Sequence, residues 1–203
     1  MSQDVLSPRP DTERWVEEAV LYAQSYKSKN VLDLGTGSGC IILTLLAQNL
    51  QMTGVGVDIS PNALQIAKIN SQKLAVENRI KFICKSWFDG DFCQLFAEKF
   101  DIITSNPPYI PTLQIFELDV GVKEYDPLLA LDGGPDGLKD YRVLAQKCPD
   151  LLSEDGVVFV EIGQGQENDV INIFNQNGLI LTRQIVDYGN IIRCLVFKKQ
   201  VAK

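Results

Sequence analysis

Residues Phe100 to Tyr109 read FDIITSNPPY, a short apolar run that ends in Asn106, Pro107, Pro108 and Tyr109. The run predicts a buried strand, and the two prolines end it because proline lacks an N–H group and has a fixed φ angle. The corner that follows presents one carboxamide, several backbone carbonyls and an aromatic ring. This set suits a flat, amide-like group, which needs acceptors for two N–H donors and a ring face to lie against. A plain proline turn is the simpler interpretation of these four residues taken alone.

The sequence around this corner alternates between strand and helix patterns. This alternation predicts an α/β fold in which helices cover both faces of a mostly parallel, seven-stranded sheet. The turn at residues 187–190 predicts that the last two strands form an antiparallel hairpin at one edge. No repeat or internal linker interrupts the pattern, so a single domain over residues 1–203 is expected. Strands are predicted at residues 31–34, 53–57, 80–84, 100–104, 157–162, 179–186 and 191–198, and helices near residues 15–23, 41–46 and 138–152, after Ser60-Pro61 and before the final two strands.

The composition excludes several classes of chemistry. The chain has no histidine, which removes Ser-His and Cys-His catalysis and histidine-ligated metals, and no metal site is expected. Its 5 cysteines are scattered and form no Cys-x-x-Cys pair, which favours a reducing compartment over a zinc site or a disulfide framework. A net charge of −7 gives no general attraction for nucleic acid. No apolar run is long enough for a membrane span and no signal peptide opens the chain, so a cytoplasmic protein without membrane contact is expected.

Glycines at alternate positions follow the first predicted strand, where residues Asp33 to Gly39 read DLGTGSG. Glycines let the backbone bend sharply and approach a ligand closely. The pattern differs from both the dinucleotide fingerprint and the phosphate loop, and favours a ligand with a cationic amino-acid part. Asp58 ends the next strand, where an acidic residue can hold ribose hydroxyls. The segment Ser86-Trp87 and the Asn106 corner follow the third and fourth strands, so four signals meet at the edge of the sheet where such folds bind ligands.

With these motifs the chain resembles the class I S-adenosylmethionine-dependent methyltransferases of Rossmann-like fold, and more closely the release-factor glutamine methyltransferases of the HemK/PrmC type. The resemblance covers nearly the whole chain. The proline-rich start and the Asp-Gly-Leu loop are its most specific parts, whereas Asn-Pro-Pro-Tyr is shared with DNA adenine and RNA guanine methyltransferases. The resemblance rests on Pro8–Glu13 (PRPDTE), Asp33–Gly39, Asp58, Trp87-Phe88, Asn106–Tyr109, Tyr125-Asp126-Pro127, Ala130-Leu131, Gly133–Leu138 (GGPDGL) and Gly189–Arg193.

The resemblance implies transfer of a methyl group from S-adenosyl-L-methionine to the side-chain amide nitrogen of a glutamine. The glutamine belongs to the Gly-Gly-Gln motif of a peptide chain release factor, and S-adenosyl-L-homocysteine is the second product. By the same resemblance the cofactor residues are Asp33, Gly35, Thr36, Gly37, Gly39, Asp58, Ile59, Ser86, Trp87 and Asn106. Asn106, Pro107 and Tyr109 are the expected catalytic residues, and Arg9, Pro10, Glu13, Asn106, Pro107, Pro108 and Tyr109 the expected substrate-binding residues. A monomer is expected.

The chain departs from the family pattern at several places. Ser7 stands where an aliphatic residue is usual, Ser86 where an acidic residue often contacts the adenine amino group, and Asp126 where a glutamate is usual. The family's helical N-terminal domain, which helps to dock the protein substrate, is expected to be absent. Two other functions therefore stay open: methylation of an amino group on a nucleic-acid base, and a cofactor-binding module without activity. Which release factor is the target, and whether the chain turns over without that domain, also stay open.

Overall fold

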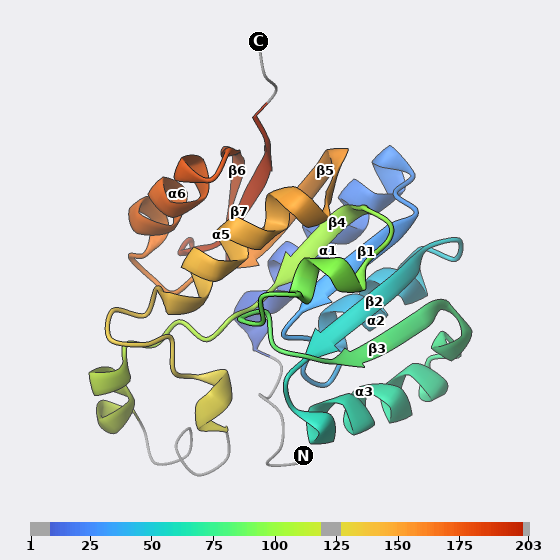
Figure 1. Cartoon of the computed structure of the whole chain (residues 1–203), viewed down its shortest axis with the longest axis horizontal. Helices are drawn as coiled ribbons and strands as arrows, with labels where there is room; N and C mark the ends of the chain where they lie inside the picture. Colours follow the sequence, from blue (N-terminus) through green and yellow to red (C-terminus); the bar gives the residue numbers. More distant parts are fainter. Residues whose placement is uncertain (1–8, 119–126, 201–203) are drawn as a thin grey trace.

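Seven strands form one sheet in the order β3-β2-β1-β4-β5-β7-β6 (Figure 1). The computed structural model describes residues 9–118 and 127–200, so the motif residues Ser7, Pro8, Tyr125 and Asp126 lie outside the described residues. Strands β1 to β5 pair in parallel, whereas β7 is antiparallel to both β5 and β6. This confirms the predicted fold class and the C-terminal hairpin. The strands are β1 Asn30–Leu34, β2 Thr53–Asp58, β3 Ile80–Cys84, β4 Phe100–Ser105, β5 Leu152–Glu161, β6 Leu179–Val186 and β7 Ile192–Lys199.

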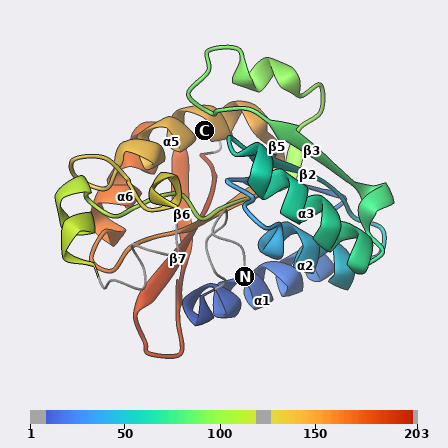
Figure 2. The same cartoon turned by 90° about the horizontal axis from the view of Figure 1, so that it is seen from below.

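Helices cover both faces of this sheet, as the alternating pattern predicts (Figure 2). One apolar cluster joins α1 and α2 to one face, and a second joins α5 and α6 to the other. Helix α3 begins with a proline after Ser60, whose hydroxyl accepts a hydrogen bond from the Ala63 N–H. The helices are α1 Pro10–Tyr26, α2 Cys40–Gln48, α3 Pro61–Lys73, α5 Lys139–Leu151 and α6 Glu167–Gln176, with short 3-10 helices η1 Glu77–Arg79, η2 Phe92–Leu95, η3 Thr112–Glu117 and η4 Leu128–Ala130.

Strand β5 differs most from its predicted bounds, because it begins at Leu152 rather than Val157. Leu152 pairs with Phe100, and the register between β4 and β5 then shifts before Ile102 pairs with Val157. The polar residues between Leu152 and Val157 carry no strand pattern, so sequence periodicity misses this irregular first part of the strand.

The long segment after Asn106 is tied together at its base. The Ile110 N–H donates to the Leu131 carbonyl, and the Thr112 hydroxyl donates to Asp132 Oδ1 at 2.7 Å. Between these ties the described part contains the short helices η3 and η4. Prolines and glycines interrupt this segment, so its short helices show no helical periodicity in the sequence.

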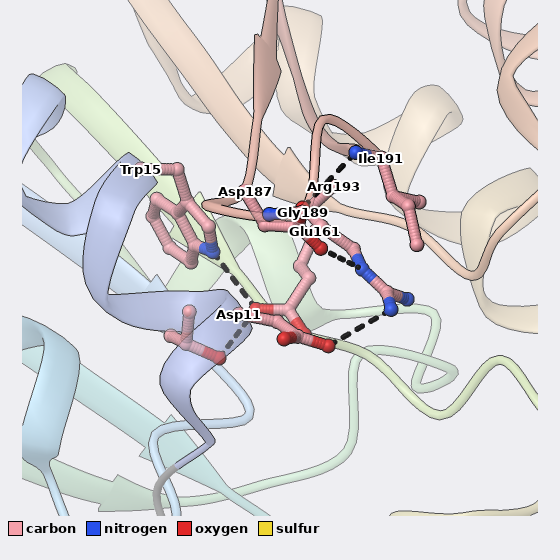
Figure 3. A network of polar contacts seen from close by, with 8 residues as sticks. Asp11, Trp15, Glu161, Asp187, Gly189, Ile191 and Arg193 are labelled. Atoms are coloured by element: carbon pink, nitrogen blue, oxygen red, sulfur yellow. Dashed lines mark hydrogen bonds and ion pairs between the residues drawn. The ribbon is translucent and has the colours of Figure 1, made fainter.

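A buried carboxylate holds helix α1 to the end of β5. Glu161 is only 2% exposed, and its Oε2 atom accepts hydrogen bonds from the Thr12 hydroxyl at 2.7 Å and from Trp15 Nε1 at 2.8 Å (Figure 3). Burial raises the pKa of this carboxyl above its ordinary value, while the two donors lower it. Buried carboxylates are stable only when they are hydrogen-bonded, so this pair of donors fixes the start of α1 against the sheet.

An ion-pair bridge joins the same helix to β7. Arg193 Nη2 lies 2.9 Å from Asp11 Oδ2 on α1, and Arg193 Nε donates a hydrogen bond to Asp187 Oδ2 at 3.0 Å (Figure 3). Asp187 also accepts the N–H groups of Gly189 and Ile191, at 2.7 and 3.0 Å, in the turn between β6 and β7. The arginine therefore couples the hairpin turn to α1.

Within the described residues, every helix is too short or too polar to cross a membrane.

We expect Trp15→Phe to lower the free energy of unfolding by about 2–4 kcal/mol. The substitution removes a hydrogen bond to a buried carboxylate and leaves unfilled volume beneath α1. Urea denaturation measures the change. Tyr188→Phe is the control, because it removes a hydroxyl that contacts Glu17 on the surface; a change within about 0.5 kcal/mol is expected there. Equal effects of the two substitutions would contradict the role of the buried network.

Candidate active site

A cavity of about 440 Å³ lies where the chain leaves strands β1 to β4. This volume falls within the range of small-molecule sites. Strand β1 is flanked by β2 and β4, so consecutive connections diverge on the two sides of β1. Such a switch point is where open α/β sheets bind ligands. Of the residues predicted from the sequence, ten line the cavity: Arg9, Gly35, Thr36, Gly37, Asp58, Ile59, Ser86, Trp87, Asn106 and Pro108.

The glycine turn after β1 forms one wall of the cavity. Gly35 has a φ of +76°, and a Cβ atom there would lie 3.3 Å from Cη2 of Trp87. Gly37 has a φ of +53°, and a Cβ atom there would meet no other atom within 4 Å. Glycine adopts these positive φ angles without strain at both positions, and at Gly35 it also leaves the space that a Cβ atom would take. The turn brings bare backbone to the edge of open space, as close approach of a ligand requires.

Asp58 links the glycine turn to the end of β2. Its Oδ2 atom accepts the Gly37 N–H at 2.8 Å, and its Oδ1 atom accepts the Ser60 N–H at 2.8 Å. A carboxylate has about four lone-pair sites, so each oxygen can accept one more hydrogen bond. Two neighbouring hydroxyls of a ribose fit this remaining capacity.

Asp33 lies behind the wall and does not line the cavity. Its carboxylate is fully buried and accepts the hydroxyls of Thr36 and Thr104, each at 2.7 Å. Burial raises the pKa of Asp33 to about 6, although the two hydroxyl donors oppose this rise. In the structure Asp33 orients the glycine turn through Thr36, and direct contact with a ligand amino group stays a prediction.

The Asn106 corner forms another part of the cavity wall, next to the glycine turn. The Ser105 hydroxyl donates to the Leu34 carbonyl at 2.8 Å, which holds the end of β4 against β1. Asn106 and Pro108 line the cavity, whereas Pro107 is buried beside it. Within residues 9–118 and 127–200, neither the Asn106 carboxamide nor the Pro107 carbonyl has a hydrogen-bond partner. The Asn106 carboxamide can therefore accept a hydrogen bond from a ligand in the cavity, and the Pro107 carbonyl keeps unused lone pairs beside it.

Tyr109 lies next to this corner but outside the wall of the cavity. Its backbone carbonyl accepts a hydrogen bond from Gln166 Nε2 at 3.0 Å, and a Cβ atom on Gly163 would lie 3.0 Å from its ring. Burial, followed by the charge of Glu161, raises the pKa of the phenol to about 12. The phenol is therefore protonated at neutral pH and is no general base there.

Two other predicted residues, Gly39 and Glu13, also lie away from the cavity. Gly39 precedes α2 with a φ of +83°, and a Cβ atom there would lie 2.9 Å from Leu43 Cδ1. This position therefore serves the packing of α2. Glu13 is exposed on α1 and borders a second, shallower depression together with Arg9 and Thr12. Pro10 is the first residue of α1.

Several residues of the cavity are not among the predicted site residues. Some of them stand within the quoted motifs, but only the tertiary structure shows that they line the cavity. They are Thr12, Phe88, Pro127–Ala130, Asp132, Lys139 and Asp140. The start of α5 at Lys139 is visible in the sequence, but its position beside Trp87 is not. Trp87 Nε1 donates to Asp140 Oδ1 at 3.0 Å, which joins the third strand's loop to this helix.

A family model described as a methyltransferase domain matches residues 25–186. The release factor glutamine methyltransferase of Rhodospirillum rubrum is 43% identical over 202 residues, which cover all of this chain and 60% of the relative. The same-named protein of Agrobacterium fabrum is 43% identical over 98% of this chain and 68% of its own length. This chain belongs to the release factor glutamine methyltransferase family. It spans between 60% and 70% of the length of the relatives cited here and of others that it matches.

Solved structures of methyltransferases share the fold of this family member at low sequence identity. The ribosomal protein L11 methylase of Lactobacillus delbrueckii subsp. bulgaricus has a TM-score of 0.66 at 17% identity, covering 97% of this chain and 82% of that one. The catalytic domain of hMettl16, solved with an RNA hairpin, has a TM-score of 0.73 at 12% identity, covering 100% of this chain and 75% of that one. At such identities these comparisons support the fold alone.

A methyl donor of the S-adenosylmethionine type fits the cavity of this family member. The glycine turn leaves room that a side chain at Gly35 would fill, and Asp58 keeps lone pairs for a diol. Trp87 and Ile59 add apolar surface on which a purine base can lie.

We expect Asp33→Asn to remove part of the pH dependence of stability. Because the folded-state pKa of Asp33 is raised to about 6, its stabilising contribution is complete below the unfolded pKa and is lost as pH rises through 6. A rise of about two pKa units corresponds to ~3 kcal/mol. Urea denaturation of the cofactor-free protein between pH 4 and 7 should therefore show a shallower decline for the variant. Parallel curves for the two proteins would contradict this origin of the decline.

Proposed function

We propose that this chain transfers a methyl group from S-adenosyl-L-methionine to the side-chain amide nitrogen of a glutamine in a peptide chain release factor. The observation that carries the proposal is the pair of unpartnered acceptors at Asn106, which lines the cavity beside the glycine turn, and at the adjoining Pro107. The names of the relatives and the family membership support the same reaction and the same substrate. This chain spans only part of the length of these relatives. Its methyl transfer, its substrate and its partner are therefore all part of the proposal.

In this proposal the cofactor lies along the carboxyl ends of β1 to β4. Gly35, Thr36 and Gly37 would border its methionine part, with Asp33 and Gly39 supporting the turn from behind. Asp58 would accept the ribose hydroxyls. Ile59, Ser86 and Trp87 would surround the adenine. When bound, the cofactor would supply a methyl group on a positively charged sulfur and leave as the thioether S-adenosyl-L-homocysteine.

Asn106 and Pro107 would orient the glutamine amide. An amide nitrogen is a poor nucleophile because its lone pair is delocalised into the carbonyl. If Asn106 Oδ1 and the Pro107 carbonyl accept its two N–H groups, they direct the lone pair at the methyl group and stabilise the positive charge that develops on nitrogen. Holding the two reactants in line supplies part of the ~7–11 kcal/mol that positioning can contribute. Pro108 and the ring of Tyr109 would border the amide.

The reaction needs no strong base. The amide proton becomes acidic only as the N–C bond forms, after which water can take it. This agrees with a chain that has no histidine and with a Tyr109 phenol whose pKa is raised to about 12.

Arg9, Pro10 and Glu13 at the start of α1 would contact the protein substrate near the entrance. Arg9 borders both the cavity and the neighbouring depression, and Glu13 borders the depression. A single methyltransferase domain, a cytoplasmic location and a monomeric state without bound nucleic acid belong to the same proposal.

We expect Asn106→Ala to lower the methylation rate by about 10²–10³-fold, because it removes an acceptor that acts on charge developing in the transition state. Cofactor affinity should change much less. The rate is measured with labelled cofactor and intact release factor, and cofactor affinity by calorimetry. An unchanged methylation rate would contradict the role of Asn106.

Asp58→Ala should show the opposite pattern, with the affinity for S-adenosyl-L-homocysteine lowered about 10–100-fold. The expected loss equals one or two hydrogen bonds to a charged group. Calorimetry measures the affinity directly. Unchanged binding would refute the assignment of Asp58 to the ribose.

Incubation with labelled cofactor tests the substrate class. Label on the release factor supports the proposal. Label on added RNA or DNA would instead show a nucleic-acid methyltransferase, and binding without transfer to either would show a silent module.

A further inference from the structure

One buried oxygen at the cavity has no partner in the structure. Asp140 lies in the first turn of α5, lines the cavity and is only 3% exposed. Its Oδ1 atom accepts Trp87 Nε1, but its Oδ2 atom has no hydrogen-bond partner within the described part of the chain. A buried carboxylate oxygen without a donor is costly, so such an atom at a ligand cavity points to a donor on the ligand.

The position of Asp140 selects among the donors that a nucleoside carries. The benzo edge of the Trp87 indole lies against Gly35, and its pyrrole N–H reaches Asp140. Asp140 therefore lies one indole length beyond the glycine turn, at the far end of the flat surface that Trp87 offers. With the ribose at Asp58, a purine on this surface would turn the edge opposite its sugar toward Asp140. In adenine that edge carries the 6-amino group.

Three other polar residues of the cavity wall each have a partner of their own. The Ser86 hydroxyl accepts the Phe88 N–H at 3.2 Å, and Lys139 Nζ lies 5.5 Å from the centre of the Phe88 ring. Asp132, which also lines the cavity, accepts the Thr112 hydroxyl and the Gly134 N–H. Both donors to Asp132 reach its Oδ1 atom; among the carboxylates of the described cavity wall, Asp140 differs in having a buried oxygen without any donor.

We propose that Asp140 Oδ2 accepts a hydrogen bond from the 6-amino group of the adenine and that Asp140 thereby selects an adenine nucleoside. This rests on the proposed function, because it assumes that the cavity binds S-adenosylmethionine. Trp87 has two roles in this arrangement: it carries the base on its ring and orients the carboxylate through Nε1. Asp140 is a binding and specificity residue, remote from the methyl group.

The substitution Asp140→Asn gives a sharp test, because it keeps the acceptor for Trp87. Asparagine Oδ1 can still accept Nε1, and its NH₂ group then replaces Oδ2 as a donor. The wild-type chain should bind S-adenosyl-L-homocysteine at least about tenfold more tightly than S-inosyl-L-homocysteine, whose 6-oxo group is an acceptor. In the variant this preference should disappear or reverse. Calorimetry with both compounds measures it without any methyl transfer.

Asp136→Asn is the matched control. Asp136 precedes α5, is 48% exposed and pairs with Arg142 on the surface, so this variant should keep the wild-type preference. Circular dichroism and thermal unfolding show whether each variant is folded.

The outcomes separate this inference from the proposed function. An unchanged preference in a folded Asp140→Asn variant would overturn the role of Asp140 while leaving the cofactor site intact. An equal loss of affinity for both compounds would also overturn it, since that result shows only support of Trp87. Failure of the wild-type chain to bind either compound would instead count against the proposed function itself.

Discussion

The buried carboxylate of Asp33 is the interaction on which the site depends. It accepts one hydroxyl from Thr36 in the glycine turn and one from Thr104 in β4, each at 2.7 Å. The turn that would carry the cofactor and the strand that presents Asn106 are therefore joined through a single buried group. The Ser105 hydroxyl adds a second tie between the ends of β4 and β1. Preorganisation of this kind matters because methyl transfer needs both reactants held in line.

A second buried carboxylate, Glu161, holds the start of α1, which borders the cavity. By accepting Thr12 and Trp15 it fixes the start of α1, while Arg193 links Asp11 to the hairpin turn at Asp187. Thr12 and Arg9 consequently border the cavity although they begin the described chain. Both networks use acidic groups at the carboxyl ends of strands, where a parallel sheet leaves space for polar side chains.

Much of the fold could be predicted because its signals are local. Apolar runs, a Ser-Pro helix start and glycines at fixed spacing each report on a few neighbouring residues, and the seven strands follow from them. The irregular start of β5 and the short helices after Asn106 could not be predicted, because their residues lack periodicity. For the site, ten predicted residues line the cavity, whereas Asp33, Gly39 and Glu13 do not. Motif spacing predicts that a residue lies near a ligand. It does not show whether that residue contacts the ligand or supports the residues that do.

The sequence by itself determined the fold class, the edge of the sheet that carries the site, and the absence of histidine chemistry. These follow from composition and from patterns that span one or two elements. Only the tertiary structure decided that Asp33 supports the glycine turn from behind, that Glu161 anchors α1, and that Asp140 meets Trp87 with one oxygen left over. The physical reason is that burial and hydrogen-bond partnership depend on residues far apart along the chain, and no local pattern records which of them pack together.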